Sequence, residues 1–321
     1  MPPTVSVVMP AYNRAHTVGA AVDSVLAQSF ADFELIVIDD GSTDATAAVV
    51  RQRGDARVHL VSHEHNRGLV ASRNHALALS EGRYVAVLDS DDLAAPDRLA
   101  RQVHALDTHP DLGEVGGWIR RIDERGRPGR IKRHPTSPRA VRAQMPWRAG
   151  IAHTTAMLRG DLARRLAYDL AYAQAEDSDL HARVLASHEI ANIGAVLGFK
   201  RSHGGQTSAD RTAARAGKQA VMARFLRQLG IEADAGELDR HFELTRPAER
   251  TRPLNGAELA WAAAWLDRLR AANARHAAFP EPEFSAFATL IQRHTALRAL
   301  PRTPGHALTA LWGMRRAPSA L

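Results

Sequence analysis

The sequence predicts an α/β protein with a mostly parallel β-sheet and flanking helices, followed by an α-helical C-terminal region. Three observations support this fold class. Short apolar runs alternate with helical patterns through the first 92 residues, and several of these runs end in polar or acidic residues. From residue 209 onward the strand patterns disappear and helical patterns remain. Strands that alternate with helices form parallel sheets joined by right-handed crossovers.

The alternating segment contains four expected strands separated by three expected helices. The strands are Val5–Pro10, Glu34–Asp40, Val58–Ser62 and Tyr84–Leu88, and the helices are Thr17–Gln28, Ala45–Arg53 and Leu69–Leu79. Continuous apolar strands are typical of a sheet that is covered on both faces. Pro10 is expected to stop the first strand, because proline has no backbone N–H to donate.

The fourth strand leads into an acidic run, Asp89-Ser90-Asp91-Asp92. Side chains alternate along an extended chain, so Asp89 and Asp91 are expected on one side and Asp92 on the other. Two carboxylates on one side repel each other unless a cation lies between them, and Mg²⁺ and Mn²⁺ prefer such oxygen ligands. Aspartate is also common in turns and helix caps. Metal binding and capping therefore both explain this run.

Polar residues also follow the first two strands, at the edge where ligands bind in sheets of this kind. They are Asn13, Asp39 and Asp40. The chain has no Gly-x-Gly-x-x-Gly after the first strand and no Gly-x-x-x-x-Gly-Lys, which argues against a dinucleotide fold and a P-loop. Asp40 could accept hydrogen bonds from a base or ribose, and a role in the turn explains it as well.

The composition excludes several classes of protein and site. The 321 residues contain no cysteine, which excludes disulfides, zinc–thiolate sites and thiol nucleophiles. The N-terminus lacks the basic segment of a signal peptide, and no 18 apolar residues follow one another. The sequence therefore predicts a cytoplasmic protein.

The net charge of +7 is unevenly distributed along the chain. Residues 1–119 carry 9 basic and 16 acidic side chains, whereas residues 120–142 carry 9 basic and 2 acidic ones. This basic run could contact phosphorylated or other anionic substrates, or it could be a solvated loop. Because arginine greatly outnumbers lysine, we expect much of the arginine to lie on the solvated surface, and we expect no nucleic-acid partner.

Four motifs in order give the chain a family resemblance. They are Val5–Arg14 (VSVVMPAYNR), Ile38–Asp44 (IDDGSTD), Asn66–Gly68 with Ser72–Asn74 (NRG and SRN), and Leu88–Asp92 (LDSDD). Together they resemble family 2 glycosyltransferases, the inverting enzymes of the GT-A fold. The resemblance covers about residues 4–208 and implies a nucleotide-sugar donor and a divalent cation, Mn²⁺ or Mg²⁺.

The resemblance also implies roles for individual residues. Asp40 would contact the base, Arg73 would support the nucleotide side, and Asp89 would lie near the ribose and the metal, with Asp91 as the principal metal ligand. The other residues implied on the donor side are Pro10, Ala11, Tyr12, Asn13 and Ser90.

A second acidic stretch begins at Glu176 and Asp177 and precedes a helical pattern through Leu180 and Val184. Acidic residues are common at helix N-termini, so stabilisation of the helix is one explanation. Inverting transfer needs a general base that takes a proton from the acceptor hydroxyl. The resemblance implies that Asp177 is this base and that Glu176 positions it or the acceptor. Asp179 is expected to brace the helix.

Three further segments were assigned partly by resemblance. Residues 153–159 are expected to form an acceptor-side strand in which His153 lines the acceptor pocket or is a structural histidine. Ile190–Leu197 is expected to be an edge strand. After it, Arg201 could neutralise phosphate charge and His203 could contact the metal or diphosphate, and Gly204 and Gly205 predict a mobile loop.

The C-terminal region is expected to be a separate helical part, with a boundary between residues 208 and 209. Helices are predicted over 213–229, 255–274 and 284–300, and Asn255 and Glu258 form a capping-box pattern. Trp261, Trp265 and Leu269 share a helix face that we expect to be core. The basic segment 308–316 could lie peripherally on an anionic bilayer at the inner face of the cell membrane, and a frayed terminus explains it as well.

The sequence thus predicts an inverting glycosyltransferase that moves a single sugar from a nucleotide-sugar, a UDP-sugar by preference, to a hydroxyl of a carbohydrate or lipid-linked acceptor. By resemblance, the setting is bacterial surface polysaccharide or glycolipid synthesis. A sugar-nucleotidyltransferase is an alternative, although it would need a basic glycine-rich loop where Pro10–Asn13 stands. A non-catalytic nucleotide- or anion-binding module is another. The sequence makes no prediction of oligomeric state.

Overall fold

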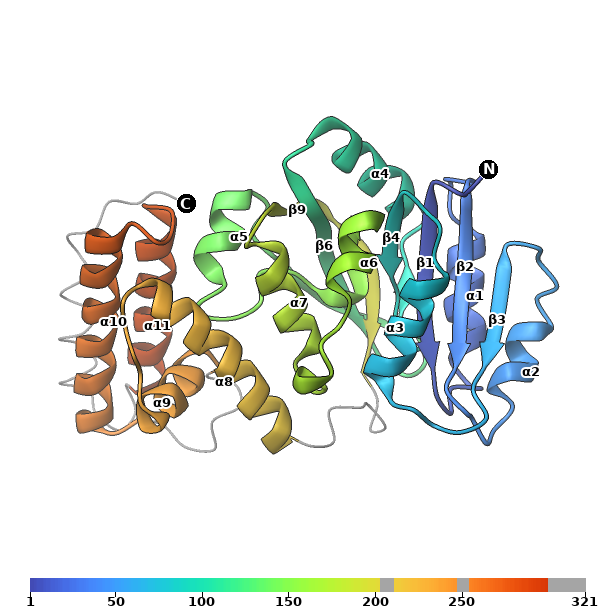
Figure 1. Ribbon diagram of the computed structural model, residues 1–321. Helices are drawn as coiled ribbons and strands as arrows, with labels where there is room; N and C mark the ends of the chain where they lie inside the picture. The colour runs from blue at the N-terminus through green and yellow to red at the C-terminus, as the bar shows by residue number, and fades with distance from the viewer. Residues whose placement is uncertain (203–210, 247–253, 300–321) are drawn as a thin grey trace. The chain divides into compact units, whose positions relative to one another are not determined.

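The computed structural model describes residues 1–202, 211–246 and 254–299 (Figure 1). The chain divides into two compact units. The first comprises residues 1–141 and 150–217, and the second comprises residues 142–149 and 218–321. Residues 142–149, from the middle of the chain, therefore belong to the C-terminal unit. Residues 211–217, which begin helix α8 (Arg211–Gln228), belong to the first unit.

The nine strands of the described residues form one sheet in the first unit. They are β1 (Val5–Ala11), β2 (Phe33–Asp39), β3 (Val58–Ser62), β4 (Tyr84–Val87), β5 (Leu93–Ala94), β6 (Leu112–Ile122), β7 (Pro128–Lys132), β8 (Met157–Arg159) and β9 (Glu189–Arg201). Their order is β3-β2-β1-β4-β8-β6-β9-β5, with β7 paired to β6. Strands β1 to β4 are parallel, as predicted, and β8 is antiparallel to both of its neighbours.

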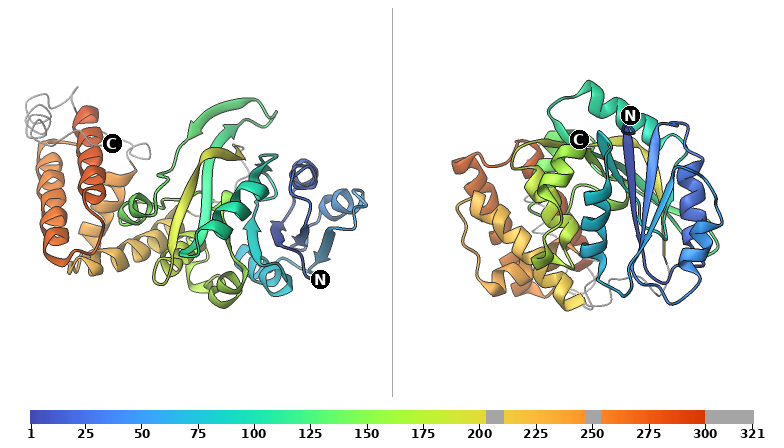
Figure 2. Two further views of the ribbon diagram at one scale, coloured as in Figure 1. Left: turned by 90° about the horizontal axis from the view of Figure 1, so that it is seen from above. Right: turned by 45° about the vertical axis from the view of Figure 1, so that its right-hand side comes forward.

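Helices cover both faces of this sheet (Figure 2). They are α1 (Val18–Leu26), α2 (Thr46–Arg51), α3 (Leu69–Leu79), α4 (Arg98–Thr108), α6 (Gly160–Leu166) and α7 (Glu176–Val184), whereas α5 (Pro138–Gln144) contains the boundary between the two units. In Figure 2 (right), α1 and α2 lie on one side of β1 to β3 and α3 lies on the other. Strands β1 and β4 are buried along their whole length, as expected for parallel strands between two helical layers. The α/β prediction is confirmed.

Two expectations about the strands were wrong. Strand β1 continues through Pro10 to Ala11, because the ladder with β4 has already ended there and no donor is needed on that side. Residues 153–155 form a 3₁₀ turn, and only Met157–Arg159 is a strand. Among the described residues, 190–197 pair with β6 alone, because β5 pairs with β9 only at Gly198 and Phe199; this stretch is therefore an edge of the sheet, as expected.

The second unit is helical, as predicted. Its helices are α9 (Ala235–Thr245), α10 (Gly256–His276), α11 (Glu283–Ala299) and most of α8 (Arg211–Gln228). Reciprocal capping boxes begin α9 and α10, with Asn255 and Glu258 in the second of these. Trp265 and Leu269 are core residues, whereas Trp261 is half-buried and stacks on Trp265.

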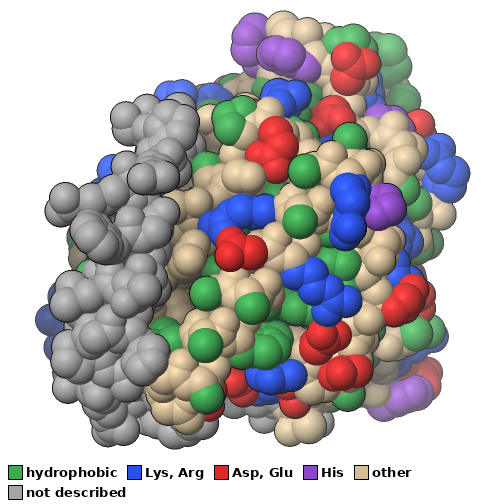
Figure 3. Space-filling view, turned by 90° about the vertical axis from the view of Figure 1, so that its left-hand side faces the viewer, with side chains coloured by type: hydrophobic (Ala, Val, Ile, Leu, Met, Phe, Trp, Pro, Cys, Tyr) green, Lys and Arg blue, Asp and Glu red, His purple; other side chains and the backbone are tan. Residues whose placement is uncertain are grey.

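The described residues expose few large apolar side chains, namely those of Met1, Tyr12, Leu79, Leu170, Leu290 and Leu297. On the face shown in Figure 3, charged side chains of both signs are interspersed with apolar ones. Among the described residues, no helix has the length and apolar character needed to cross a bilayer. The predicted bilayer-contact segment 308–316 lies outside the described residues.

Candidate active site

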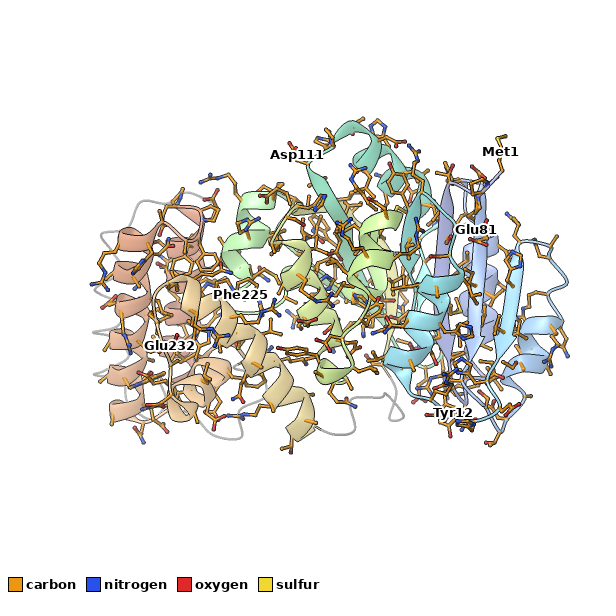
Figure 4. The ribbon with its side chains drawn as sticks, in the orientation of Figure 1. Met1, Tyr12, Glu81, Asp111, Phe225 and Glu232 are labelled. Atoms are coloured by element: carbon orange, nitrogen blue, oxygen red, sulfur yellow. The ribbon has the colours of Figure 1, made fainter. Side chains whose placement is uncertain are left out.

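The carboxyl ends of β1 and β2 meet at one edge of the sheet, where the loops that follow them are joined to each other. Figure 4 shows Met1 at one end of the unit and Tyr12 at this opposite edge. Asn13 adopts a left-handed conformation with φ 52°, which asparagine tolerates better than most residues. Its N–H donates to the Ser42 hydroxyl at 2.9 Å, and its side-chain oxygen accepts from the N–H of Thr43 at 2.9 Å. Tyr12 is left exposed.

Asp40 is buried behind this edge, and both of its carboxylate oxygens already accept hydrogen bonds. The backbone N–H groups of Arg67 and Gly68 each donate at 2.9 Å, and Nδ1 of His63 lies at 2.7 Å. Burial opposes ionisation of Asp40, but these hydrogen bonds hold its pKa below the ordinary value. The structure thus shows Asp40 holding the turn at residues 66–68, while its predicted contact with a base stays a prediction.

Three carboxylates cluster after β4. Oxygens of Asp89, Asp91 and Asp92 lie within 4.8 Å of one another. The expectation that Asp92 points to the opposite side was wrong, because β4 ends at Val87 and the chain then turns, with the N–H of Asp92 donating to the carbonyl of Asp89 at 3.0 Å. Strict alternation of side chains holds only while the backbone is extended.

Asp92 is the most buried of the three and is only partly satisfied. One of its oxygens accepts from the backbone N–H of Arg201 at 2.9 Å, and Oδ2 is buried without a hydrogen-bond partner. Burial, together with the nearby Asp89 and Asp91, raises the pKa of Asp92 to about 7. A buried carboxylate oxygen that lacks a partner, next to two more carboxylates, fits a divalent cation that prefers oxygen ligands.

Three basic side chains surround this cluster. Arg73 donates to Asp89 at 3.0 Å, and Arg14 lies 3.9 Å from Asp91. Lys200 is largely buried, which lowers its pKa, but Asp89, Asp92 and Asp91 outweigh this effect and raise the pKa above its ordinary value. The three carboxylates therefore lie together, and the positively charged side chains of Arg14, Arg73 and Lys200 lie beside them.

Arg73 joins the aspartate cluster to the start of α7. Its guanidinium donates to Glu176 as well as to Asp89, and its side chain is only 4% exposed. Burial raises the pKa of Glu176, against the opposing effect of Arg73. Asp177 is half-buried beside Glu176, and its carboxylate accepts from the N–H of Ser178 at 2.6 Å. The guanidinium of Arg73 thus connects the acidic run at residues 89–92 to the acidic stretch that begins at Glu176, although the two are at least 84 residues apart in the sequence.

A buried polar layer supports the start of α7. His181, one turn after Asp177, pairs with Glu114 of β6 at 2.9 Å, and both side chains are fully buried. Nε2 of His153 lies 2.9 Å from the Tyr168 hydroxyl, and the His153 ring packs against that of His181. Of the two roles expected for His153, the contacts seen are those of a hydrogen-bonded structural histidine.

Arg201 binds backbone rather than an open face of the site. Its guanidinium donates to the carbonyls of Asp91 (3.1 Å), Asp123 (3.2 Å) and Glu124 (2.9 Å). Its predicted contact with phosphate stays a prediction. His203 and the predicted mobile loop at Gly204 and Gly205 lie outside the described residues.

Several residues at the site were not predicted. Asp92 stood in the acidic run and was misplaced only by the assumption of an extended chain. Arg14 lay inside the first motif. Lys200, Glu114 and His181 carried no signal, because their roles depend on neighbours that are distant in sequence.

The sequence of this chain matches the model of glycosyl transferase family 2 over residues 6–166. It is 36% identical to "Putative glycosyltransferase EpsE" of Bacillus subtilis (strain 168) over 51% of this chain and 59% of that protein. It is 42% identical to "UDP-Glc:alpha-D-GlcNAc-diphosphoundecaprenol beta-1,3-glucosyltransferase WfgD" of Escherichia coli over 32% and 40%. The chain thus spans less than two thirds of the length of either relative.

Solved structures share the fold. Staphylococcus aureus TarS 1-349 in complex with UDP-GlcNAc aligns with a TM-score of 0.60 at 19% identity, covering 98% of this chain and 92% of TarS 1-349. The mannosyltransferase PcManGT of Pyrobaculum calidifontis, in complex with GDP-Man and Mn²⁺, aligns with a TM-score of 0.56 at 22% identity over 98% and 89%. With the family match over half of its length, and the motifs of that match gathered at one sheet edge, the chain belongs to glycosyl transferase family 2.

Proposed function

We propose that this protein is an inverting glycosyltransferase that moves one sugar from a UDP-sugar to a hydroxyl of a carbohydrate or lipid-linked acceptor. The observation that carries the proposal is the Arg73 bridge between the aspartate cluster and the first turn of α7. It brings a site for a donor diphosphate next to a carboxylate that can act as a base. UDP and GDP sugars bound to structures of the same fold support the nucleotide-sugar class.

On the donor side, Asp89 and Asp91 would hold Mn²⁺ or Mg²⁺, with Asp92 as a further oxygen ligand. The cation would offset the charge that grows on the departing diphosphate. Tyr12 and Asn13, with Pro10, Ala11 and Ser90, would line the nucleotide side. Arg14 and Lys200 add positive charge beside the cluster, where the diphosphate would lie.

On the acceptor side, the carboxylate of Asp177 would take the proton of the acceptor hydroxyl. The hydroxyl oxygen forms a bond to the anomeric carbon while the bond from that carbon to the diphosphate oxygen breaks, which inverts the configuration. A positioned base typically contributes about 10²–10⁴-fold to rate. Arg73 and Glu176 would fix the base relative to the donor.

The setting would be polysaccharide or glycolipid assembly in the cytoplasm, peripheral to the inner face of the membrane. The names of relatives support this setting, since one is a "Succinoglycan biosynthesis protein ExoO" and another uses a diphosphoundecaprenol acceptor.

A thermal-shift screen with UDP-, GDP- and dTDP-sugars, each with Mn²⁺ or EDTA, tests the donor side, because a bound donor raises apparent stability. We expect a Mn²⁺-dependent shift with one donor class, and its loss in Asp91→Asn. The control is Asp97→Asn, which changes an exposed aspartate paired with Arg101. An unchanged shift in Asp91→Asn would refute the ligand role.

Product analysis separates the alternatives. A glycosyltransferase releases nucleoside diphosphate, a nucleotidyltransferase releases pyrophosphate, and a binding module shows a donor shift without turnover.

A further inference from the structure

The β6–β7 hairpin, shown in green in Figure 2, concentrates positive charge on one exposed element. Residues 118–133 carry seven basic and two acidic side chains. Of the two acidic residues, Asp123 is already bound by Arg127 at 2.6 Å. No exposed large apolar side chain of the described residues lies on this hairpin. The surface is thus suited to a charged ligand in water rather than to insertion into a bilayer.

Three of these arginines have no side-chain partner within the part of the chain that the structure describes. Arg121, Arg125 and Arg130 are exposed, and among the described residues none of their side chains makes a hydrogen bond or ion pair. The solvated-surface expectation therefore holds for these three, in contrast to the buried Arg73, Arg98 and Arg201.

The sheet register brings Arg130, Arg121 and Lys200 into a row across the neighbouring strands β7, β6 and β9. Arg121 of β6 is paired with Lys200 of β9, and on its other side the β6–β7 ladder has an irregularity at which Arg121 lies beside Gly129 and Arg130. Like charges directly opposite each other destabilise a sheet. The three aspartates already offset the charge of Lys200, so the repulsion that is left lies between Arg121 and Arg130, and an anion bound between these two would remove it.

The row leads to the candidate active site. Lys200 interacts with all three aspartates of the cluster, and Arg201 joins the carbonyl of Asp91 to the carbonyls of Asp123 and Glu124 at the hairpin turn. One guanidinium therefore separates the hairpin turn from the proposed donor site. The hairpin turn is thus tied directly to the loop that carries the aspartate cluster.

We propose that Arg121 and Arg130 form an acceptor-binding surface for a phosphate or diphosphate group on the acceptor. This inference rests on the proposed function and adds the chemical class of the acceptor. The donor diphosphate is assigned to the aspartate cluster, so the hairpin is left for the second substrate. A bilayer headgroup is disfavoured by the missing apolar side chains and by the connection to the site.

The test measures binding of a labelled octyl diphosphate and of the uncharged labelled octanol by fluorescence anisotropy, at 50 mM and 300 mM NaCl. EDTA is present, so that cation-dependent binding at the donor site does not contribute. Arg121→Gln/Arg130→Gln is compared with Arg51→Gln/Arg165→Gln, which removes two exposed arginines of α2 and α6. Among the described residues, those two arginines also lack a side-chain partner.

We expect the wild type to bind the diphosphate at least tenfold more tightly than the octanol at 50 mM NaCl. Arg121→Gln/Arg130→Gln should lose most of this preference, the control pair should stay within twofold of wild type, and salt should weaken only the diphosphate. Equal affinity of the hairpin variant and the wild type would overturn the proposal, as would a wild type without preference for the diphosphate.

Two further measurements identify the source of any effect. Co-sedimentation with vesicles containing 30% phosphatidylglycerol should be the same for both double variants; a loss confined to the hairpin variant, with diphosphate binding intact, would assign the surface to lipid and overturn the proposal. The Mn²⁺-dependent donor shift should persist in both variants. If the wild type shows that shift without diphosphate preference, only the acceptor proposal fails, whereas a missing shift counts against the proposed function.

Discussion

At the scale of single residues, the pKa of each buried carboxyl group at the site depends on the charged side chains that lie next to it. Asp89 and Asp92 lie in the same turn, yet burial is offset at Asp89 by Arg73 and Lys200, so its pKa is lowered, whereas the pKa of Asp92 is raised. The difference follows from one guanidinium that reaches only one of the two carboxylates. A single residue, Arg73, therefore sets much of the electrostatics of the cluster.

Asp177→Asn should abolish transfer while leaving donor binding intact, because an amide cannot accept the acceptor proton. We expect kcat to fall by about 10²–10⁴-fold. The measurement pairs turnover with the Mn²⁺-dependent donor shift, and the control is Asp161→Asn, an exposed acidic residue in the first turn of α6. Turnover within tenfold of wild type would exclude Asp177 as the base.

Arg73→Lys should keep the charge but lose the bridge, because a lysine ammonium cannot match the planar fork that reaches both Glu176 and Asp89. We expect the free energy of unfolding to fall by at least about 1–3 kcal/mol, the range for a buried polar group left without its partner, which charged groups exceed. Urea unfolding measures this, with the exposed Arg101→Lys as control. If Arg73→Lys and Arg101→Lys lose the same free energy of unfolding, the bridge from Arg73 to Glu176 and Asp89 does not stabilise the protein.

At the scale of elements, α7 is held to the sheet by a pair that makes no contact with solvent. Glu114 of β6 and His181 of α7 are both 0% exposed. Burial lowers the pKa of His181, but Glu114 outweighs this and raises it above its ordinary value. A histidine with a raised pKa stabilises the folded state fully below its unfolded pKa, and this contribution is lost as the pH rises through the folded pKa.

Glu114→Gln should therefore destabilise the protein more at pH 6 than at pH 9, since it leaves a buried imidazolium without its counter-charge at the lower pH. The expected loss at pH 6 is about 3 kcal/mol, the lower end for breaking a buried pair. Urea unfolding at both pH values measures the effect. Glu114→Gln/His181→Asn should recover part of it, and a penalty that does not depend on pH would contradict the ion-pair assignment.

Sequence patterns were sufficient to predict some of the helices and strands but not others. The parallel strands and helices of the first 92 residues were predicted, because their apolar periodicity is local and follows directly from burial. Strand β8 has only three residues after a 3₁₀ turn, which is too short for a pattern. Much of the arginine was expected on the surface, yet Arg98 is buried in α4 and donates to the carbonyls of Val87, Thr154 and Ala156, which no periodicity could show.

At the scale of the whole molecule, the two units contain different buried titratable groups. In the helical unit His241 is fully buried, with Nε2 2.8 Å from the Pro146 carbonyl and with Nδ1 accepting from the Trp265 indole at 3.0 Å. The neutral ring satisfies both contacts, donating through Nε2 and accepting through Nδ1. Burial lowers the pKa of His241 to about 4.

Stability of the helical unit should therefore fall as the pH decreases from about 6.5 towards 4, because in this window the unfolded chain binds a proton that the folded chain does not. A depression from 6.5 to about 4 corresponds to about 3 kcal/mol. His241→Gln can donate to Pro146 and accept from Trp265 without titrating, so its unfolding midpoint should vary less between pH 7 and 4.5. The control His104→Gln, on the surface of α4, should show the same change of unfolding midpoint with pH as the wild type. If His241→Gln also shows the wild-type change, His241 is not the source of the pH dependence.

The sequence by itself determined the α/β class, the helical C-terminal region and the polar residues at the strand ends, because all of these follow from local periodicity and from motifs of neighbouring residues. Only the tertiary structure decided that Asp92 joins Asp89 and Asp91, that Arg73 connects the cluster to α7, and that Arg121 stands opposite Lys200. The physical reason is that burial and charge pairing depend on distance in space, and the fold brings together residues such as Arg73 and Glu176 that lie 103 positions apart in the sequence.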